Sequence, residues 1–197
     1  MIDFADGVSV ITPERLENLR RALKATQDLP GDMAELGVYR GGSAKVIAAT
    51  CPAKILHLFD TFTGLPYSET VERDPERYVR KGMFSACSEA EVRMYLGIGR
   101  HVYHPGLFPA SAEGFQDSDT SFSFVHVDCD LYDGARDAIR FFWPRMVHGG
   151  IMFFDDYNCK FTGVTEAVDE VFHESRIMKQ TEPSTGVQIG CYVVKGG

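Results

Sequence analysis

Two apolar stretches that each end in aspartates constrain the fold of this chain most. Phe122–Val127 is β-branched or aromatic at most positions, which is typical of a buried strand, and Asp128 follows it at once. Ile151–Phe154 is apolar throughout and runs into Asp155 and Asp156. In open α/β sheets, ligands bind outside the carboxyl ends of the strands. If the two stretches are parallel neighbours, their carboxylates share one crevice, and such a cluster is unfavourable unless a cation neutralises it.

Strand and helix signals alternate along most of the chain. A capping threonine followed by Pro13 predicts the first helix, and Leu29-Pro30-Gly31 closes it. Two strands in a row end the chain, so we predict a doubly wound α/β domain with a mostly parallel sheet and an antiparallel last strand. We expect one domain, 1–197, with a short N-terminal helical extension, 1–31. The other predicted strands are Met33–Leu36, Ile55–Phe59, His101–His104, Ile177–Thr181 and Val187–Val194, and the other predicted helices cover Ser43–Thr50, Ser88–Leu96, Tyr132–Trp143 and a segment after Gly163 carrying Ala167 to Phe172.

Composition narrows the classes of partner. The 197 residues carry a formal net charge of −8, which disfavours binding to nucleic acid and to anionic membranes. No apolar run approaches the roughly 20 residues of a membrane helix, and no signal peptide is evident, so we expect a cytoplasmic protein. Five cysteines without Cys-x-x-Cys spacing indicate reduced thiols rather than a zinc ribbon or a disulfide framework.

A glycine-rich turn follows the first predicted strand. Glu35 lies two residues before Gly37, and the turn continues to Ser43, where a helix begins. Such a turn allows a cofactor to approach the backbone, although its spacing fits neither a phosphate loop nor a clean dinucleotide motif. Asp60 ends the next strand, about 20 residues on, and is placed to accept hydrogen bonds from ribose hydroxyls or to cap a turn. Because Asp60 follows the glycine turn in this way, we favour the ribose role for Asp60.

Three ordered motifs carry a resemblance to a known family. They are Glu35–Ser43, Phe59–Pro66, and Val127–Tyr132 together with Gly149-Gly150 and Asp155-Asp156-Tyr157. From Asp32 to Phe172 the chain resembles the macrocin O-methyltransferase family (TylF-like), a branch of the class I S-adenosylmethionine-dependent methyltransferases. The resemblance implies a seven-stranded Rossmann-like sheet, S-adenosylmethionine as methyl donor, a divalent metal that is usually magnesium, and sugar hydroxyls on small natural products as acceptors. The resemblance also makes a homodimer one expected state, without deciding the oligomeric state.

The resemblance also implies roles for individual residues. It assigns the metal to Asp128, Asp155 and Asp156, and the general base to Asp130. It assigns the methionine part of the cofactor to the glycine turn, the ribose and nucleoside to the end of the second strand, and the adenine border to the end of the third. The cofactor residues are Glu35, Gly37, Tyr39, Gly42, Ser43, Asp60, Thr61, Phe62, Gly106 and Leu107. The segment before the first strand is short, and Asn158–Glu166 keeps Gly163 but lacks the basic character expected just after it. Both features depart from the family pattern and leave the acceptor open.

The residue types suit methyl transfer to oxygen. An aliphatic hydroxyl is a poor nucleophile, and a bound metal lowers its pKa. Sulfur-free carboxylate ligands suit Mg²⁺, with Mn²⁺ or Ca²⁺ as alternatives. Strand alternation would put Asp128 and Asp130 on one side, provided the strand persists that far. Asp133 adds a fifth carboxylate at the same two strand ends.

Other interpretations compete with this one. Asp128-Cys129-Asp130 also matches the Asp-x-Asp triplet of glycosyltransferases, although that function leaves Asp155, Asp156 and the glycine turn unexplained. A non-catalytic protein that keeps the fold is a third hypothesis. His126 reads as a core histidine, whereas His104 and His148 are candidates for the acceptor pocket. Residues 66–84 are predicted to form an excursion at the edge of the sheet, and whether they close over the site as a lid is left open.

Overall fold

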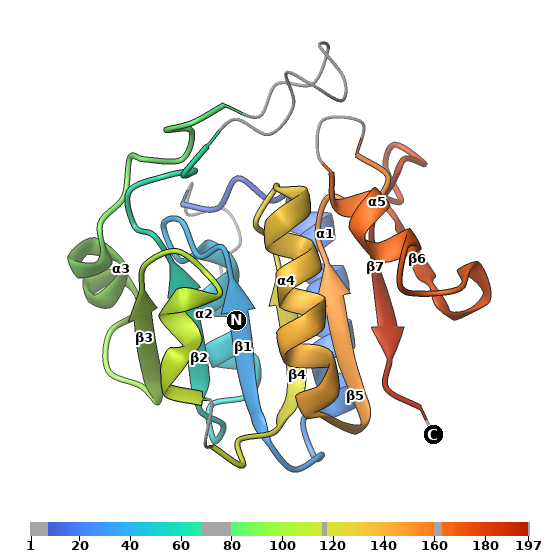
Figure 1. Ribbon diagram of the computed structural model, residues 1–197, viewed down its shortest axis with the longest axis horizontal. Helices are drawn as coiled ribbons and strands as arrows, with labels where there is room; N and C mark the ends of the chain where they lie inside the picture. The colour runs from blue at the N-terminus through green and yellow to red at the C-terminus, as the bar shows by residue number, and fades with distance from the viewer. Residues whose placement is uncertain (1–7, 68–79, 116–117, 160–162, 197) are drawn as a thin grey trace.

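The computed structural model describes residues 8–67, 80–115, 118–159 and 163–196, which form a seven-stranded sheet between two layers of helices (Figure 1). The strand order is β3-β2-β1-β4-β5-β7-β6. The first five strands along the chain pair in parallel, and β7 runs antiparallel to both β5 and β6. This confirms the predicted doubly wound fold. The strands are β1 Asp32–Leu36, β2 Leu56–Asp60, β3 His101–Pro105, β4 Phe122–Val127, β5 Met146–Phe154, β6 Met178–Thr181 and β7 Gln188–Val194.

Helices cover both faces of the sheet (Figure 1). The helix α1 begins where the sequence predicts, because Thr12 accepts a hydrogen bond from the Arg15 backbone N–H at 3.4 Å and Pro13 opens the first turn. Ser88 caps α3 in the same way. The helices are α1 Pro13–Thr26, α2 Gly42–Thr50, α3 Glu89–Leu96, α4 Tyr132–Phe142 and α5 Val164–Asp169, with short 3-10 turns η1 Ala110–Phe115, η2 Trp143–Arg145 and η3 Glu174–Arg176.

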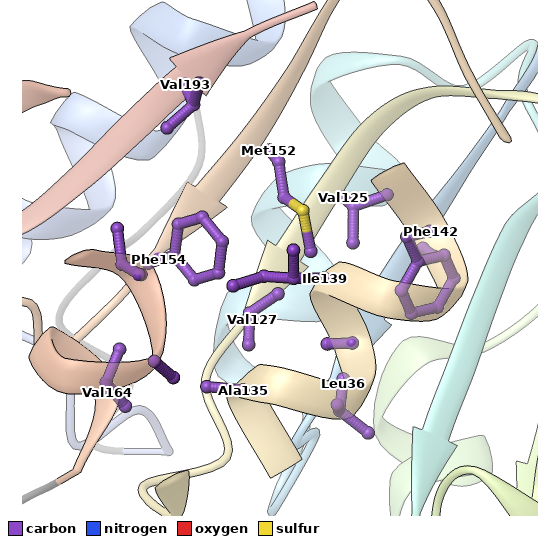
Figure 2. Packing of buried hydrophobic residues seen from close by; sticks show 14 of the residues in the cluster. Leu36, Val125, Val127, Ala135, Ile139, Phe142, Met152, Phe154, Val164 and Val193 are labelled. Atoms are coloured by element: carbon purple, nitrogen blue, oxygen red, sulfur yellow. The ribbon is translucent and has the colours of Figure 1, made fainter. Parts of the chain in front are cut away.

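The core is split into two layers by the sheet. On one face, side chains of β4 and β5 pack against α4 and α5, as Figure 2 shows for Val125, Phe154, Ile139 and Val164. On the other face, α1 and α2 pack with the opposite sides of the same strands. Leu16, Leu19 and Leu23 of α1 are almost fully buried there. The helix α1, which lies within the predicted N-terminal extension, is therefore an integral part of the domain's core.

Two predicted boundaries are wrong. The strand β5 begins at Met146, so Gly149-Gly150 lies inside it rather than before it. His148 consequently lies near the amino end of β5, at the edge opposite the aspartates, and does not line the predicted acceptor pocket. The helix α5 ends at Asp169, before Val171 and Phe172. Most of the predicted excursion, residues 68–79, lies outside the described residues.

Strand register brings the aspartates to one edge. Leu36 on β1 pairs with Val127 on β4, and Val127 pairs with Phe154 on β5. The next residues along the three strands are Gly37, Asp128 and Asp155, and they therefore leave the sheet side by side.

Within the described residues, no helix has the length and apolar character needed to cross a bilayer.

Candidate active site

A cavity of about 390 Å³ lies where the five parallel strands end. Its walls come from the ends of β1 to β5, from Val10 and Ile11 before α1, and from the first turn of α4. The cavity contains most of the predicted site residues: Gly37, Tyr39, Asp60, Thr61, Gly106, Leu107, Asp128, Asp130, Asp155 and Asp156. The structure therefore brings these ten residues together around one cavity.

Gly37 joins the glycine turn to the acidic strand end. It has φ +88°, and a Cβ placed on it would lie 1.7 Å from the Asp128 carbonyl oxygen. The Asp128 N–H donates to the Leu36 carbonyl at 2.8 Å, and the Gly37 N–H donates to the Phe59 carbonyl at 2.9 Å. Only glycine combines this positive φ with so close a backbone approach. The turn that faces the cavity is therefore fixed relative to Asp128.

Asp60 organises the glycine turn from the neighbouring strand. One carboxylate oxygen accepts hydrogen bonds from the N–H groups of Val38 and Tyr39, at 2.7 and 2.8 Å. The other oxygen accepts from the Phe62 N–H at 2.7 Å. The Thr61 hydroxyl also lies 3.5 Å from this oxygen, but it donates its one proton to the Gly64 carbonyl at 2.7 Å. A carboxylate offers about four lone-pair sites, so the three backbone bonds leave about one acceptor site for a ligand in the cavity. The geometry is consistent with the predicted ribose contact.

Three carboxylates gather at the ends of β4 and β5. One ligand oxygen each from Asp128, Asp155 and Asp156 lies within 4.8 Å of the other two. Oxygens on an octahedral Mg²⁺ at about 2.1 Å stand roughly 3 Å apart in cis and roughly 4 Å apart in trans. A small contraction of this cluster would therefore match a hard divalent cation.

Electrostatics show that this cluster is short of positive charge. Burial raises the pKa of the Asp128 carboxyl well above its usual value, and the charges of Asp155 and Asp156 raise it further. Burial and the neighbouring Asp155 likewise raise the pKa of Asp156. Oxygen-only donors whose ionised forms repel each other are the chemistry that a hard cation fits.

Asp130 reaches the cluster by a different route from the one predicted. The strand β4 ends at Val127, and Asp130 lies in a turn with φ +60°, so strand alternation does not place it. Its carboxyl hydrogen-bonds the side chain of Asp156, and burial together with the Asp156 charge raises the pKa of Asp130 well above its usual value. Asp156 also has positive φ, at +49°. Left-handed turns therefore turn both acids toward the cluster.

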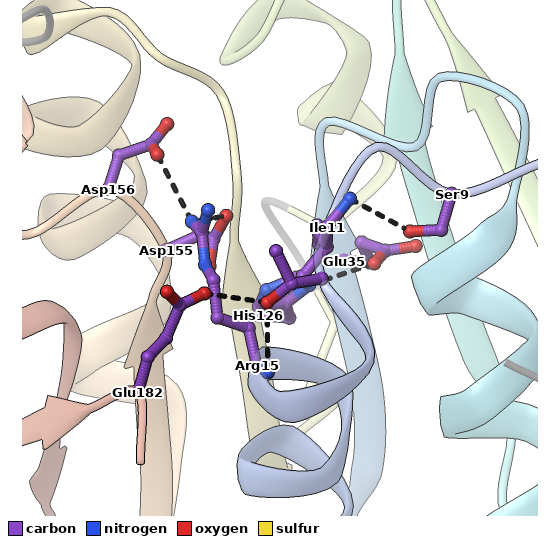
Figure 3. A network of polar contacts seen from close by, with 9 residues as sticks. Ser9, Ile11, Arg15, Glu35, His126, Asp155, Asp156 and Glu182 are labelled. Carbon is purple, nitrogen blue, oxygen red and sulfur yellow. Dashed lines mark hydrogen bonds and ion pairs between the residues drawn. The ribbon is translucent and has the colours of Figure 1, made fainter. Parts of the chain in front are cut away.

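Arg15 on α1 is a residue of this site that the sequence did not reveal. Its guanidinium contacts Asp155 and lies 3.2 Å from an Asp156 oxygen (Figure 3). Burial by itself would lower the pKa of Arg15, but the Asp155 and Asp156 charges outweigh it and raise that pKa. The site thus contains a cation supplied by the chain itself.

Comparison with known proteins identifies the family. A family model described as Macrocin-O-methyltransferase (TylF) matches residues 5–191, nearly the whole chain. The chain belongs to the macrocin O-methyltransferase family. This membership confirms the resemblance carried by the three sequence motifs.

Two curated proteins are similar to this member of the TylF family. One is the 8-demethyl-8-(2,3-dimethoxy-alpha-L-rhamnosyl)-tetracenomycin-C 4'-O-methyltransferase of Streptomyces olivaceus, 28% identical over 73% of this chain and 60% of that protein. The other is the demethyldecarbamoylnovobiocin O-methyltransferase of Streptomyces niveus, 29% identical over 84% of this chain and 68% of that protein. The chain thus spans 60% and 68% of the length of these relatives.

Solved structures confirm the fold of this TylF family member. The O-methyltransferase NovP superposes with a TM-score of 0.75 at 23% identity, covering 98% of this chain and 84% of that chain. The calicheamicin methyltransferase CalS11 gives a TM-score of 0.79 at 20% identity, covering 93% and 79%. At these identities the likeness concerns the Rossmann-like methyltransferase fold.

Four predicted cofactor residues do not line the cavity of this family member. Glu35 is fully buried on the α1 and α2 side of the sheet, where a carboxylate oxygen lies 2.8 Å from His126 Nδ1 (Figure 3). The N-terminal segment passes so close to Gly42 that a Cβ there would lie 2.5 Å from Ser9. Ser43 and Phe62 are buried behind the turn. Cofactor contact by these four residues stays a prediction, since none of them lines the cavity.

The remaining sequence candidates have structural roles. His126 is a satisfied core histidine, as predicted, through its contact with Glu35. His104 does not line the cavity; it stacks on Phe59 with ring centroids 4.3 Å apart. Asp133 lines the cavity but forms an ion pair with Arg136 rather than joining the three-carboxylate cluster.

Proposed function

We propose that this chain is a metal-dependent O-methyltransferase that moves a methyl group from S-adenosylmethionine to a sugar hydroxyl of a glycosylated natural product. The observation that carries the proposal is the partly buried carboxylate cluster beside the glycine-turn cavity. Family membership supports the reaction. The names of the relatives support the acceptor class, since one names a rhamnosyl-tetracenomycin and another protein of this fold is called a TDP-rhamnose 3'-o-methyltransferase.

The cofactor would occupy the part of the cavity between β1 and β3. Gly37 and Tyr39 would face its methionine part, and Asp60 would accept a ribose hydroxyl with its remaining lone pair. Gly106 and Leu107 would border the adenine. S-adenosylmethionine supplies a methyl group on a positively charged sulfur, which favours a site rich in carboxylates.

The cation would be held by Asp128, Asp155 and Asp156. Magnesium is the favoured ion because every donor is a carboxylate oxygen. A bound divalent cation would lower the pKa of the acceptor hydroxyl and reduce the repulsion within the cluster. The raised pKa values of Asp128 and Asp156 support a site that needs this charge.

Asp130 would act as the general base. As the acceptor oxygen bonds the methyl carbon and the sulfur–methyl bond breaks, the hydroxyl proton would pass to the Asp130 carboxylate, leaving S-adenosylhomocysteine. The left-handed turn at φ +60° aims this side chain at the cluster. Apolar cavity walls that include Ile11 and Phe108 would exclude water from the acceptor.

A comparison of cofactor binding and turnover tests the proposal. Asp155→Asn should abolish methyl transfer to a panel of glycosides while the calorimetric affinity for S-adenosylmethionine stays within about threefold of wild type. Asp119→Asn, the same change at an exposed position before β4, should leave both unchanged. Full turnover by wild-type protein in EDTA would remove the cation from the mechanism. Binding of a nucleotide-sugar without S-adenosylmethionine binding would restore the glycosyltransferase alternative, which family membership disfavours.

The proposal also includes the enzyme's location, its partners and its oligomeric state. We expect a cytoplasmic enzyme that takes a small-molecule hydroxyl acceptor. The net charge of −8 disfavours nucleic acid and anionic membranes as partners. A homodimer stays a prediction, which the mass in solution would test.

A further inference from the structure

We propose that the Arg15 guanidinium acts as a counter-ion at the position in the acidic cluster where a divalent cation would bind. The guanidinium must then be displaced before the cation binds. The inference rests on the proposed metal site. It makes Arg15, a residue of α1, the determinant of how tightly the cation is held. Its role is separate from the three carboxylates that would act as ligands.

The position of the guanidinium carries the first step. One nitrogen, Nη2, contacts Oδ2 of Asp155 and lies 3.2 Å from Oδ1 of Asp156. The same two residues contribute ligand oxygens to the three-carboxylate cluster. A divalent cation would need to stand about 2.1 Å from such oxygens, which is inside the space that Nη2 and its hydrogens fill. Guanidinium and cation therefore compete for one place.

The way Arg15 is bonded favours its release. Its Nε is buried and has no hydrogen-bond partner among the residues that the structure describes. An arginine that serves only as a structural clamp usually satisfies several of its five donors, often in a two-pronged pair with one carboxylate. Here a single nitrogen bridges two acids. The contact brings one positive charge to the cluster but leaves a buried donor unsatisfied.

Other contacts hold α1 in place without Arg15. The Thr12 hydroxyl donates to the buried Glu182 carboxylate at 2.6 Å. Glu14 accepts hydrogen bonds from the N–H and the hydroxyl of Ser184, at 3.1 and 2.9 Å. These bonds tie the start of α1 to the β6–β7 connection. Displacement therefore requires only a rotamer change of the long Arg15 side chain, not a movement of the helix.

Charge counting supports the exchange. When ionised, Asp128, Asp130, Asp155 and Asp156 bring four negative charges to one edge of the sheet. Arg15 offsets only one of them, whereas a divalent cation offsets two. Arg15 is thus the weaker counter-ion, able to hold the cluster together and able to be replaced.

Calorimetric titration with Mn²⁺ and Mg²⁺ at pH 8, without cofactor or acceptor, tests the exchange. Arg15→Gln should bind each cation roughly tenfold more tightly than wild type, because no charge-assisted hydrogen bond has to break first. Arg15→Lys, which keeps the charge, should lie between the two. Arg21→Gln is the matched control, since it removes the same charge from an exposed position of the same helix and should bind as wild type does.

The outcomes separate the two proposals. Cation binding of equal or weaker affinity in Arg15→Gln overturns the role of Arg15 and leaves the metal site standing. Absence of cation binding to every variant overturns the metal site itself, and this inference with it. If Arg15→Gln does not fold, the Arg15 side-chain NMR signals of wild-type protein provide the readout. The hindered rotation of its guanidinium should become free when Mg²⁺ is added, and unchanged rotation in the loaded protein overturns the exchange.

Discussion

Gly37→Ala should be among the most destabilising single changes in the chain. A residue with a side chain at φ +88° costs roughly 1–2 kcal/mol in the left-handed region. The new Cβ would also lie 1.7 Å from the Asp128 carbonyl oxygen, and real Cβ contacts with backbone are essentially never under 3.0 Å. The ends of β1 and β4 would have to separate, breaking the 2.8 Å bond from the Asp128 N–H to Leu36, worth about 1 kcal/mol. With packing strain of about 1–3 kcal/mol, the expected loss is about 4 kcal/mol.

Urea denaturation of the cofactor-free protein measures this loss against a matched control. Gly186→Ala changes another glycine of positive φ, +70°, where a Cβ would meet nothing within 4 Å. It should cost only the roughly 1–2 kcal/mol of the backbone conformation. Equal losses in the two variants would refute the close approach between the glycine turn and Asp128.

Two further predictions concern the cavity and the sheet edge. Asp60→Ala removes the acceptor for three backbone N–H groups and for the ribose, so its affinity for S-adenosylmethionine should fall at least about 100-fold by calorimetry, and wild-type affinity would contradict the ribose role. Burial, with a contribution from His57, lowers the pKa of His104 to about 4. Because the unfolded chain then binds more protons between about pH 6.5 and 4, His104 makes stability fall as pH drops through that window, and His104→Phe should flatten that slope in thermal melts. An unchanged slope would place the acid sensitivity elsewhere.

The sequence predicted the sheet well because its strands are short apolar runs with clear ends. The boundaries of Phe122–Val127 match β4 to the residue. The start of β5 was missed, since Gly149-Gly150 carries the local signal of a break. In the folded protein Gly149 donates to the Lys195 carbonyl at 2.7 Å, and the Lys195 N–H donates to Gly150 at 2.8 Å. Pairing with the chain's far end therefore overrides the local preference.

Some residues of the candidate site could be predicted from their local sequence, whereas others could not. Asp128 and Asp155 were predictable because a residue that follows a parallel strand must appear at its carboxyl edge. Arg15 was not, because it comes from a helix 140 residues before Asp155 and stands among other charged residues of α1. The family resemblance assigned Glu35 to the cofactor, but its side chain lies in the core. Successive strand residues face opposite sides, so with Leu36 at the cavity Glu35 points into the core beneath.

Several features of the cavity edge oppose stability. Asp130 and Asp156 hold left-handed backbone conformations that residues with side chains seldom adopt, and each has a pKa raised by burial and a neighbouring acid. An acid whose pKa is higher in the folded state loses stability as pH rises through that value, so the cluster weakens the fold most when it is fully ionised. Strained backbone and repelling charges that are confined to one edge of an otherwise well-packed sheet are typical of functional sites. The same ionised state is the one that would bind a cation and accept a proton, so the features that cost the fold stability are those the proposed chemistry requires.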